Sequence, residues 1–362
     1  MTLNKFLFVV LALTVIPSQV HACQSGSRSS VATGQVFSNP PALSSGATFQ
    51  QPAFQQPAFQ VSGSSTTALP QGGLPIQQGS ASRSQASEVA ASSGSIGIPA
   101  SSLVDPIFEV NDPNSLYAVD HTAWDNFLAR YLVTDSQGLN RIHYGRVDSC
   151  DRQQLNYYLE QLQATNISLL NRDEQLAYWF NLYNAKTVSI VLSKYPVRSV
   201  RQIKQKLTDF VGPFDDEGVV QVLGKPLSLN DIESGIVRPI WNDPRIHYAL
   251  NCASFGCPNL APTAWTGHDL DARLNGAAYE FVNSGRAVKS GLFGVRTAKI
   301  YKWYAADFGG SDEAVLRHIQ QYANCETARK ISGRNSICGY FYDWSLNDGR
   351  ITRRRFLEPL RR

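Results

Sequence analysis

The sequence predicts an α+β fold: a single globular domain of several helices with short antiparallel hairpins, after a disordered N-terminal tether. Apolar residues recur at helical spacing between residues 121 and 196, and the pattern then changes to short runs separated by glycine-containing turns. Helices therefore come first, and mixed hairpins and helices follow. Because strands and helices do not alternate regularly, a doubly wound parallel sheet is not expected.

The first 22 residues have the layout of a secretory signal peptide: Lys5, the apolar run FLFVVLALTVI, and a small-residue cleavage site. The run is shorter than the about 20 apolar residues of a membrane-spanning helix. We therefore expect an exported protein that is periplasmic or attached to the cell envelope. Residues 20–23 also resemble a lipoprotein box with Cys23 as the acylated residue, although an ordinary signal peptidase site fits them equally well. Contact with a membrane is expected only through such a lipid anchor.

Residues 23–104 are rich in Ser, Gln, Gly, Pro and Ala and contain few large apolar residues. Such a composition cannot bury enough apolar surface to fold, which predicts a disordered linker. The folded domain is accordingly expected over residues 105–362. A linker of this kind suits a domain held away from a membrane or wall.

Three helices are expected at the start of the domain, over residues 121–132, 151–163 and 171–195. The third is the strongest, because Asn171 can cap its N-terminus and Glu174 stands three residues later as a capping-box partner. It is apolar on nearly every face except at Asn181, Asn184 and Lys186. This pattern indicates a central, buried helix.

Shorter elements are expected in the remainder of the chain. In order, they are a hairpin over 219–229 that turns at Gly224-Lys225-Pro226, a short helix capped by Asn230, a helix over 269–282, a second hairpin over 286–298 that turns at Ser290-Gly291, a helix over 311–322, and an aromatic strand over 338–344.

The charge and motifs of the chain exclude several function classes. The formal net charge is only +4, with Lys and Arg spread along the chain, so nucleic acid is not an expected partner. There is no glycine-rich phosphate loop, so nucleotide binding is not expected and no cofactor is implied. The partner we expect is an envelope substrate or protein whose identity the sequence does not give.

Five blocks in one order resemble a known family: YWFNLYNAKTV, LSLNDIE, DPRIHYALNCASFGCPNL, KIYKWYAADFGG and YDWSLND. Together they identify residues 177–348 as similar to the family catalogued as domain of unknown function 547. Members with secretion signals are common in bacteria, which agrees with the expected export. The family is named for having no assigned activity, so the resemblance implies no reaction.

Residues 246–260, IHYALNCASFGCPNL, gather the most groups able to act as nucleophile, base or ligand. The functional hypothesis makes Cys252 a thiol nucleophile with His247 as its general base, since a thiolate near neutral pH needs a base or a positive field. Asn181 or Asn184 would orient the imidazole. On the substrate side, Arg245 would hold a carboxylate, and the backbone from Ser254 onward would donate to an oxyanion.

Regular secondary structure does not bring the two groups together. In a strand, His247 and Cys252 point to opposite faces, and in a helix capped by Asp243 they lie about 140° apart. A break in the chain at Asn251-Cys252 is therefore needed for this pair. Cys252 could also have another histidine as its partner, for example His121 or His143.

The cysteines permit two other interpretations. In an exported protein, Cys257 could form a disulfide with Cys252 or Cys150, leaving His247 as a satisfied core residue. A metal site of His247, Cys252 and Cys257 is disfavoured, because the spacing is not that of a tight Cys-x-x-Cys knuckle and no fourth ligand is evident; no metal is expected. Cys325 and Cys338 flank a short polar loop and are the most natural disulfide pair.

The leading hypothesis is therefore a cysteine-dependent hydrolase or acyltransferase of the cell envelope. The alternative is a non-catalytic binding or scaffold module of the envelope, whose His, Cys and Asn residues are structural. A free Cys252 thiol beside a pocket would favour the enzyme, and a disulfide at Cys252 would exclude it.

Overall fold

A computed structural model describes residues 104–203 and 219–349. Helices and short, mostly antiparallel strands are mixed in this region without regular alternation, which confirms the α+β prediction. The expected signal peptide and nearly all of the expected linker lie outside the described residues. Within those residues, no helix combines the length and the apolar character that crossing a membrane requires.

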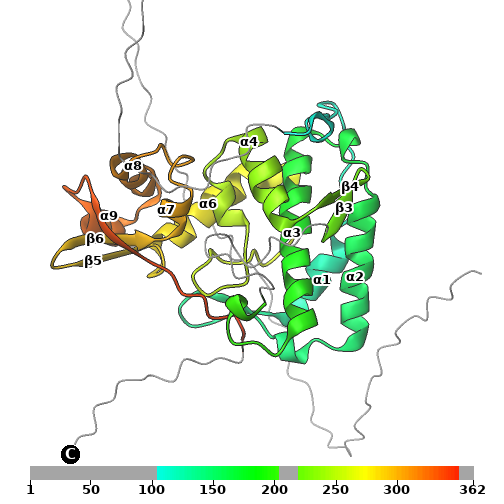
Figure 1. The fold of residues 1–362 in the computed structure, drawn as a ribbon, viewed down its shortest axis with the longest axis horizontal. Helices are drawn as coiled ribbons and strands as arrows, with labels where there is room; N and C mark the ends of the chain where they lie inside the picture. Colours follow the sequence, from blue (N-terminus) through cyan, green and yellow to red (C-terminus); the bar gives the residue numbers. More distant parts are fainter. Residues whose placement is uncertain (1–103, 204–218, 350–362) are drawn as a thin grey trace, which may run out of the picture. The chain divides into compact units, whose positions relative to one another are not determined.

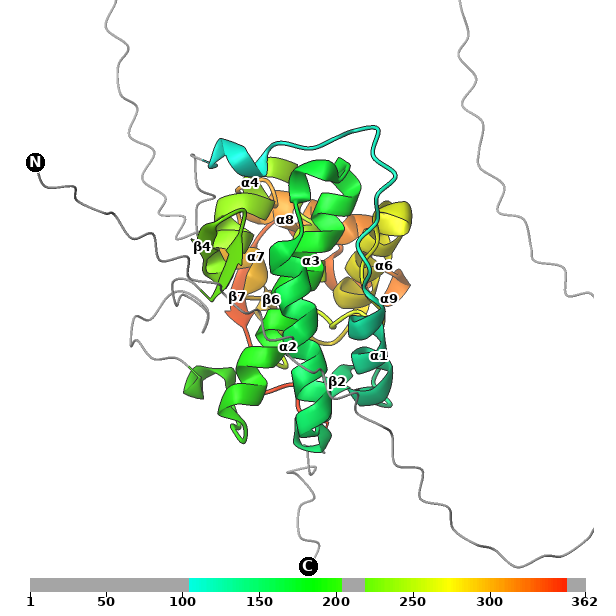
Figure 2. The ribbon, with the colours of Figure 1, turned by 90° about the vertical axis from the view of Figure 1, so that its right-hand side faces the viewer.

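The first part of the domain is built around one long buried helix. Helices α1 (Thr122–Tyr131), α2 (Ser149–Ala164) and α3 (Arg172–Lys194) form at the expected positions. Helices α1 and α2 lie on one side of α3 with the later hairpin β3–β4 (residues 220–227), and the C-terminal helices and strands lie on its other side (Figures 1 and 2). Most residues of α3 are buried, Asn181 and Asn184 among them, so it is the central helix that its composition predicted.

Only half of the expected capping box forms at the start of α3. The side chain of Asn171 accepts a hydrogen bond from the backbone N–H of Glu174, with a distance of 2.9 Å. The carboxylate of Glu174 does not return to the cap. It accepts instead from the backbone N–H groups of Val119 and Gly267, at 2.9 and 2.8 Å. Glu174 thereby ties the start of α3 to two distant loops.

Two small antiparallel hairpins accompany the helices. Strands β1 (Leu132–Thr134) and β2 (Asn140–Ile142) form a hairpin that was not predicted. Strand β3 (Val220–Val222) pairs with β4 (Lys225–Leu227) in the expected hairpin, although Lys225 and Pro226 lie on the strand and not in the turn. The second hairpin turns at Leu223-Gly224, where both residues have positive φ.

The short helix expected next is a π-helix over Asp231–Val237, followed by α4 (Arg238–Trp241) and α5 (Ile246–Ala249). Asn230 does not cap it, contrary to the prediction. The turn is closed instead by reciprocal bonds between Ser228 and Asp231, because a serine three residues before an aspartate supplies both partners.

The C-terminal part combines a three-stranded sheet with four helices. Its elements are α6 (Leu270–Asn283), β5 (Val288–Gly291), β6 (Gly294–Ala298), α7 (Ile300–Trp303), α8 (Asp312–Tyr322), α9 (Cys325–Ile331) and β7 (Ile337–Phe341). The strand order is β5-β6-β7; β6 runs antiparallel to β5, but β7 runs parallel to β6, which a prediction of hairpins alone did not include. Helices α7, α8 and α9 lie near this sheet in Figure 1. Five 3₁₀ turns complete the described structure: Pro106–Phe108, Tyr144–Arg146, Ile167–Leu169, Val200–Gln202 and Gly267–Asp269.

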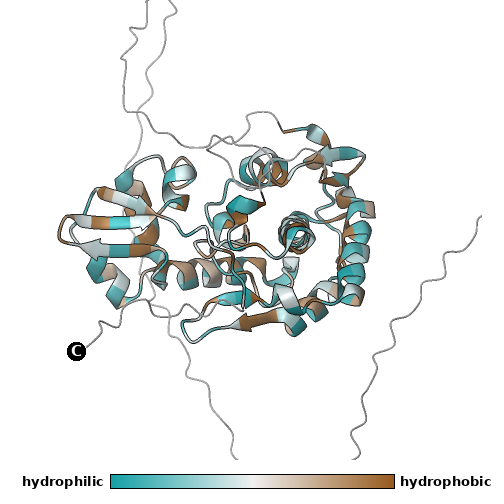
Figure 3. Ribbon diagram, turned by 60° about the horizontal axis from the view of Figure 1, so that its bottom comes forward, coloured by the Kyte–Doolittle hydropathy of each residue, from teal (hydrophilic) through white to brown (hydrophobic). Residues whose placement is uncertain are grey.

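Helix α5 joins two hydrophobic clusters. Ile246, Ala249 and Leu250 belong to the larger cluster around α1, α2 and α3, and Tyr248 belongs to the second cluster around α6, α8 and the sheet. Figure 3 shows hydrophobic residues in the helices of both parts. The residues that follow α5 are thus held from two sides, which gives a loop an unusually rigid base.

Candidate functional site

The segment with the densest chemistry leaves its helix just before Asn251. Leu250 is already extended, with φ −87° and ψ 121°, and Ala253 has a positive φ of 60°. The break that the hypothesis required is therefore present. Asp243 does not begin this helix: it accepts from the N–H of Arg245 in a turn, and α5 starts at Ile246.

Asn251 and Asn184 fix the path of the loop. The Asn251 side chain donates to the carbonyl of Pro258 at 2.7 Å and accepts from the N–H of Ala253 at 2.9 Å. Asn184, on α3, donates to the carbonyl of Ala249 and accepts from the N–H of Asn251, both at 2.9 Å. Because all four bonds are buried, the loop cannot move without losing them.

Four side chains form what we call the sulfur cluster: Cys252, Ser254, Cys257 and Tyr342. The Cys252 sulfur lies 3.2 Å from the hydroxyls of both Ser254 and Tyr342. The Tyr342 hydroxyl also lies 3.2 Å from the Cys257 sulfur, which accepts the N–H of Cys252 at 3.1 Å. Both cysteines are free thiols, so neither of the disulfides considered for them is formed. Cys252 is half-buried and Cys257 is buried.

The sulfur cluster separates the two thiols chemically. A hydrogen bond from Cys257 is the main cause that lowers the pKa of Cys252 to about 7, helped by Ser254 and Tyr342 against the opposing effect of burial. Burial, followed by the neighbouring Cys252, raises the pKa of Cys257. The pair therefore loses its first proton more readily than its second, and the surroundings favour the ionised form of Cys252.

A short backbone pairing holds Tyr342 against the loop. The N–H of Phe255 donates to the carbonyl of Ser345 at 2.7 Å, and the N–H of Gly256 donates to that of Asp343 at 2.8 Å. A Cβ at Gly256 would lie 2.8 Å from the Asp343 nitrogen and 3.0 Å from the ring of Tyr342. This position therefore needs glycine for the close approach.

His247 belongs to a second group, which we call the carboxylate cluster: Glu233, Arg238, His247 and Asp307. The Nε2 atom of His247 lies 2.7 Å from the carboxylate of Asp307, and its Nδ1 atom lies 3.7 Å from that of Glu233. The imidazole also stacks on the ring of Tyr304, with centroids 4.0 Å apart. Arg238 is almost fully buried and holds Asp307 through two bonds of 2.6 and 2.9 Å.

Both carboxyls of this cluster are held ionised. Burial raises the pKa of Glu233, but hydrogen bonds from His247 and Tyr304 and the charge of Arg238 lower it below its ordinary value. Burial likewise opposes ionisation of Asp307, and bonds from His247 and Arg238 lower its pKa to about 2. Glu233 lies on the π-helix, a type of irregular helix found often at functional sites.

His247 and Cys252 are not joined by a hydrogen bond, because carboxylates face both nitrogens of the imidazole. The two clusters are neighbours through the buried Tyr183 and the half-buried Tyr304. Burial raises the pKa of Tyr183 and of Tyr304, and the charges of both Glu233 and Cys252 add to the effect. Tyr183 also donates to Glu233 at 3.2 Å.

The remaining predicted site residues have other partners. Asn181 bonds the backbone of Trp265 in both directions and lies 3.0 Å from the Nε2 of His121, so it does not orient His247. Asn184 binds only the loop backbone described above. The guanidinium of Arg245 is occupied by Asp243, Asp271 and Asn275, at distances between 2.7 and 3.1 Å.

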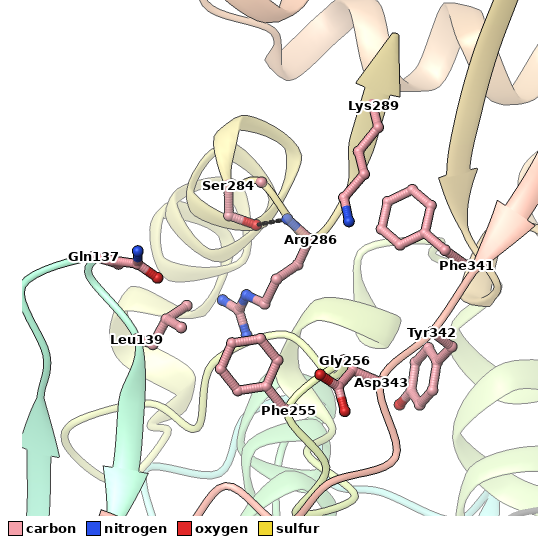
Figure 4. Close-up of a pocket in the computed structure, with 11 residues that line it drawn as sticks. Gln137, Leu139, Phe255, Gly256, Ser284, Arg286, Lys289, Phe341, Tyr342 and Asp343 are labelled. Atoms are coloured by element: carbon pink, nitrogen blue, oxygen red, sulfur yellow. Dashed lines mark hydrogen bonds between the residues drawn. The ribbon is translucent and has the colours of Figure 1, made fainter. Parts of the chain in front are cut away.

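A pocket of about 340 Å³ adjoins the sulfur cluster (Figure 4). Phe255, Gly256 and Tyr342 form part of its wall, so the loop and the tyrosine that contact Cys252 also face this space. Figure 4 shows Arg286 and Lys289 extending into the same region. The pocket thus combines aromatic walls with cationic side chains, and its volume falls in the range of small-molecule sites.

The disulfide expected between Cys325 and Cys338 is not formed. Cys325 and Cys338, expected to pair, are both free and exposed. Cys325 begins α9 and Cys338 lies on β7, and the structure does not bring them into a bond. Among the described residues, no group of three or more His, Cys, Asp or Glu side chains could hold a metal ion.

Comparison with known proteins identifies a family over part of the chain. Residues 167–282 match the family model described as "Protein of unknown function, DUF547". This range includes α3, the π-helix and the loop with both cysteines, whereas Asp307 and Tyr342 lie beyond it. No curated protein and no solved structure matches the chain.

Proposed function

We propose that this protein, which matches the DUF547 family model over residues 167–282, is a thiol-dependent hydrolase or acyltransferase with Cys252 as its nucleophile. The observation that carries the proposal is the environment of one sulfur atom. Three donors, from Cys257, Ser254 and Tyr342, converge on Cys252 and lower its pKa to about 7. A buried structural thiol would show the opposite shift, as Cys257 does.

In the proposed reaction, the thiolate of Cys252 attacks the carbonyl carbon of an acyl substrate. The carbonyl electron pair moves onto oxygen, and collapse of this intermediate expels the leaving group and leaves a thioester on Cys252. Once the sulfur has formed its new bond, the hydroxyls of Ser254 and Tyr342 no longer stabilise a thiolate. They become free to donate to the oxyanion and to the departing group. Water or a second acceptor then cleaves the thioester.

In this proposal His247 is a positioning residue and not the general base. Hydrogen bonds already stabilise the thiolate, so the first step does not require an imidazole to take its proton. His247 instead holds Glu233 and Asp307 ionised, and its stacking fixes Tyr304 beside the loop. Asn184 also acts through the backbone, because it bonds to Ala249 and Asn251 just before Cys252.

Acylation of the full chain with p-nitrophenyl acetate tests the proposal. We expect a rapid release of p-nitrophenol and a single acetyl group on Cys252, located by peptide mass spectrometry, and both should disappear in Cys252→Ala. Cys325→Ser is the matched control, because it removes an exposed thiol that does not belong to the sulfur cluster. Acetylation of Cys252 no faster than that of Cys325 would refute the nucleophile, and the non-catalytic module would then explain the same residues better.

Export is a separate part of the proposal. The support for it is the arrangement of residues 1–22, a basic residue followed by an apolar run and a small-residue site. N-terminal analysis of protein recovered from the envelope fraction tests it. A chain that begins at about residue 23, with or without a lipid on Cys23, is expected. A soluble chain that retains Met1 would contradict it.

A further inference from the structure

We infer that Cys252 and Cys257 form a reversible dithiol–disulfide couple, so that this loop is a site of thiol–disulfide exchange. The structure holds the reduced form. In the oxidised form a bond joins the two sulfurs and Cys252 is no longer a nucleophile. The couple requires no acyl substrate, and it goes beyond the function proposed above.

The first support is the position of the two sulfurs. The Cys257 sulfur lies 3.1 Å from the backbone nitrogen of Cys252, and both sulfurs lie 3.2 Å from the single hydroxyl of Tyr342. Each thiol also shifts the pKa of the other, which requires the two side chains to lie close together. A disulfide requires short distances of this kind between side chains, together with side chains that point toward one another.

The second support is that the loop between the two cysteines is already closed. Asn251 holds Ala253, the residue after Cys252, and Pro258, the residue after Cys257, through one side chain. The N–H of Cys257 also donates to the carbonyl of Ser254 at 3.2 Å. Bringing the ends of the loop together therefore costs little further chain entropy when the bond forms.

The third support is that the two thiols differ in how easily they ionise. Cys252 carries the stabilised thiolate, which is the attacking species in exchange, and Cys257 is the buried thiol that can resolve the product. Cys325 and Cys338 are both exposed, and no such contact joins them. The couple is thus specific to the loop and is not a general property of the free thiols described here.

The exchange uses a small disulfide, such as oxidised glutathione, as the oxidant. The thiolate of Cys252 attacks one sulfur of that disulfide, forms a mixed disulfide and expels the first thiolate of the oxidant. Cys257 then loses its proton and attacks the Cys252 sulfur, which expels the second thiolate. Two protein thiols have given up two electrons and two protons, and the small disulfide has become two thiols.

Peptide mapping after exposure of the reduced full-length protein to oxidised glutathione, followed by rapid acid quenching, tests the inference. In the wild type we expect a peptide linked between Cys252 and Cys257, with two hydrogens lost and no retained glutathione. In Cys257→Ser, which is close in size, we expect glutathione to remain on Cys252. The double variant Cys325→Ser/Cys338→Ser is the control and should still form the link.

Three results would overturn the inference. One is a wild-type protein that keeps glutathione on Cys252 while Cys257 remains a free thiol. Another is a linked peptide that pairs either cysteine with a different residue. The third is a wild-type protein in which neither Cys252 nor Cys257 is oxidised. If Cys257→Ser fails to fold, the wild-type map alone decides between these outcomes. Acyl transfer is measured separately on the reduced protein, so its failure would be distinguishable from failure of the couple.

Discussion

Replacing Tyr342 with phenylalanine removes one hydroxyl and leaves the ring in place, which tests how the structure stabilises the Cys252 thiolate. That hydroxyl lies 3.2 Å from the Cys252 sulfur and 2.8 Å from the Ser254 hydroxyl. A hydrogen bond to a charged group contributes about 1.5–3 kcal/mol. Tyr342 shares the thiolate with Cys257 and Ser254, which both have larger effects, so we expect the lower end of this range.

At 1.36 kcal/mol for each pKa unit, Tyr342→Phe should raise the pKa of Cys252 by about 1. The assay is the rate of alkylation of Cys252 by iodoacetamide between about pH 5 and pH 10, followed by peptide mass spectrometry. The reaction rate of a thiolate increases with its basicity, with a Brønsted coefficient of about 0.5. The variant should therefore titrate at higher pH and reach an alkaline plateau about threefold faster than the wild type.

Tyr340→Phe is the matched control for this experiment. Tyr340 lies on β7, two residues before Tyr342, but its hydroxyl contacts Asp312 at 3.3 Å and not the sulfur cluster. Its alkylation profile should coincide with that of the wild type. If Tyr342→Phe gave an unchanged midpoint while both variants melted at the wild-type temperature, the hydroxyl would not stabilise the thiolate, and the argument from the sulfur cluster would fail.

Three further changes test the surroundings of the site. Gly256→Ala should lower the unfolding free energy by about 1–3 kcal/mol and raise the pH midpoint for alkylation of Cys252, because the added methyl group displaces the ring of Tyr342. The control is Gly276→Ala in α6, where the added methyl group meets no atom within 4 Å and should not destabilise the protein. Denaturant unfolding measures the stability of both variants. Arg238→Ala removes a buried guanidinium from the half-buried carboxylate of Asp307 and should cost about 3 kcal/mol in the same assay, whereas Arg317→Ala breaks an exposed pair and should cost less than about 1 kcal/mol. The pKa of Asp307 is lowered to about 2, so its contribution to the unfolding free energy should be complete above its ordinary pKa of about 3.9 and should be lost as the pH falls toward 2. If the stability of the wild type falls no faster over this pH range than that of Asp307→Asn, this expectation is wrong.

The helices were predictable because their signals are local. Asn171 before a long apolar run marks the start of α3, and its amides stand out within that run. The same local reasoning failed where a side chain found a distant partner. Glu174 leaves its cap for Val119 and Gly267, because two unpaired backbone N–H groups in separate loops compete with one at the cap. Spacing along the chain does not reveal such competition.

Sequence analysis located the loop of the site but not the partners of its side chains. Cys252 and Ser254 were singled out together and lie together, whereas His247 bonds a carboxylate 60 residues away in place of the cysteine. Asp307 and Tyr342 were missed as partners, because the contacts that define them appear only when the C-terminal elements fold back onto α5. The one signal available in the sequence was that Asp307 and Tyr342 each place a charged or hydroxyl group within a run of aromatic residues.

The two proposals share Cys252 but differ in what they require of Cys257. Acyl transfer uses Cys257 only as a hydrogen-bond donor to the thiolate, and a serine hydroxyl can take that place. The disulfide requires the second sulfur itself. Cys257→Ser should therefore keep acetylation of Cys252 while losing the linked peptide, whereas loss of the Tyr342 hydroxyl should weaken the thiolate on which both reactions depend. Cys257→Ser could instead abolish acetylation while the fold stays intact and Cys252 stays accessible. The Cys257 thiol would then have a chemical role in acyl transfer that hydrogen bonding alone does not supply.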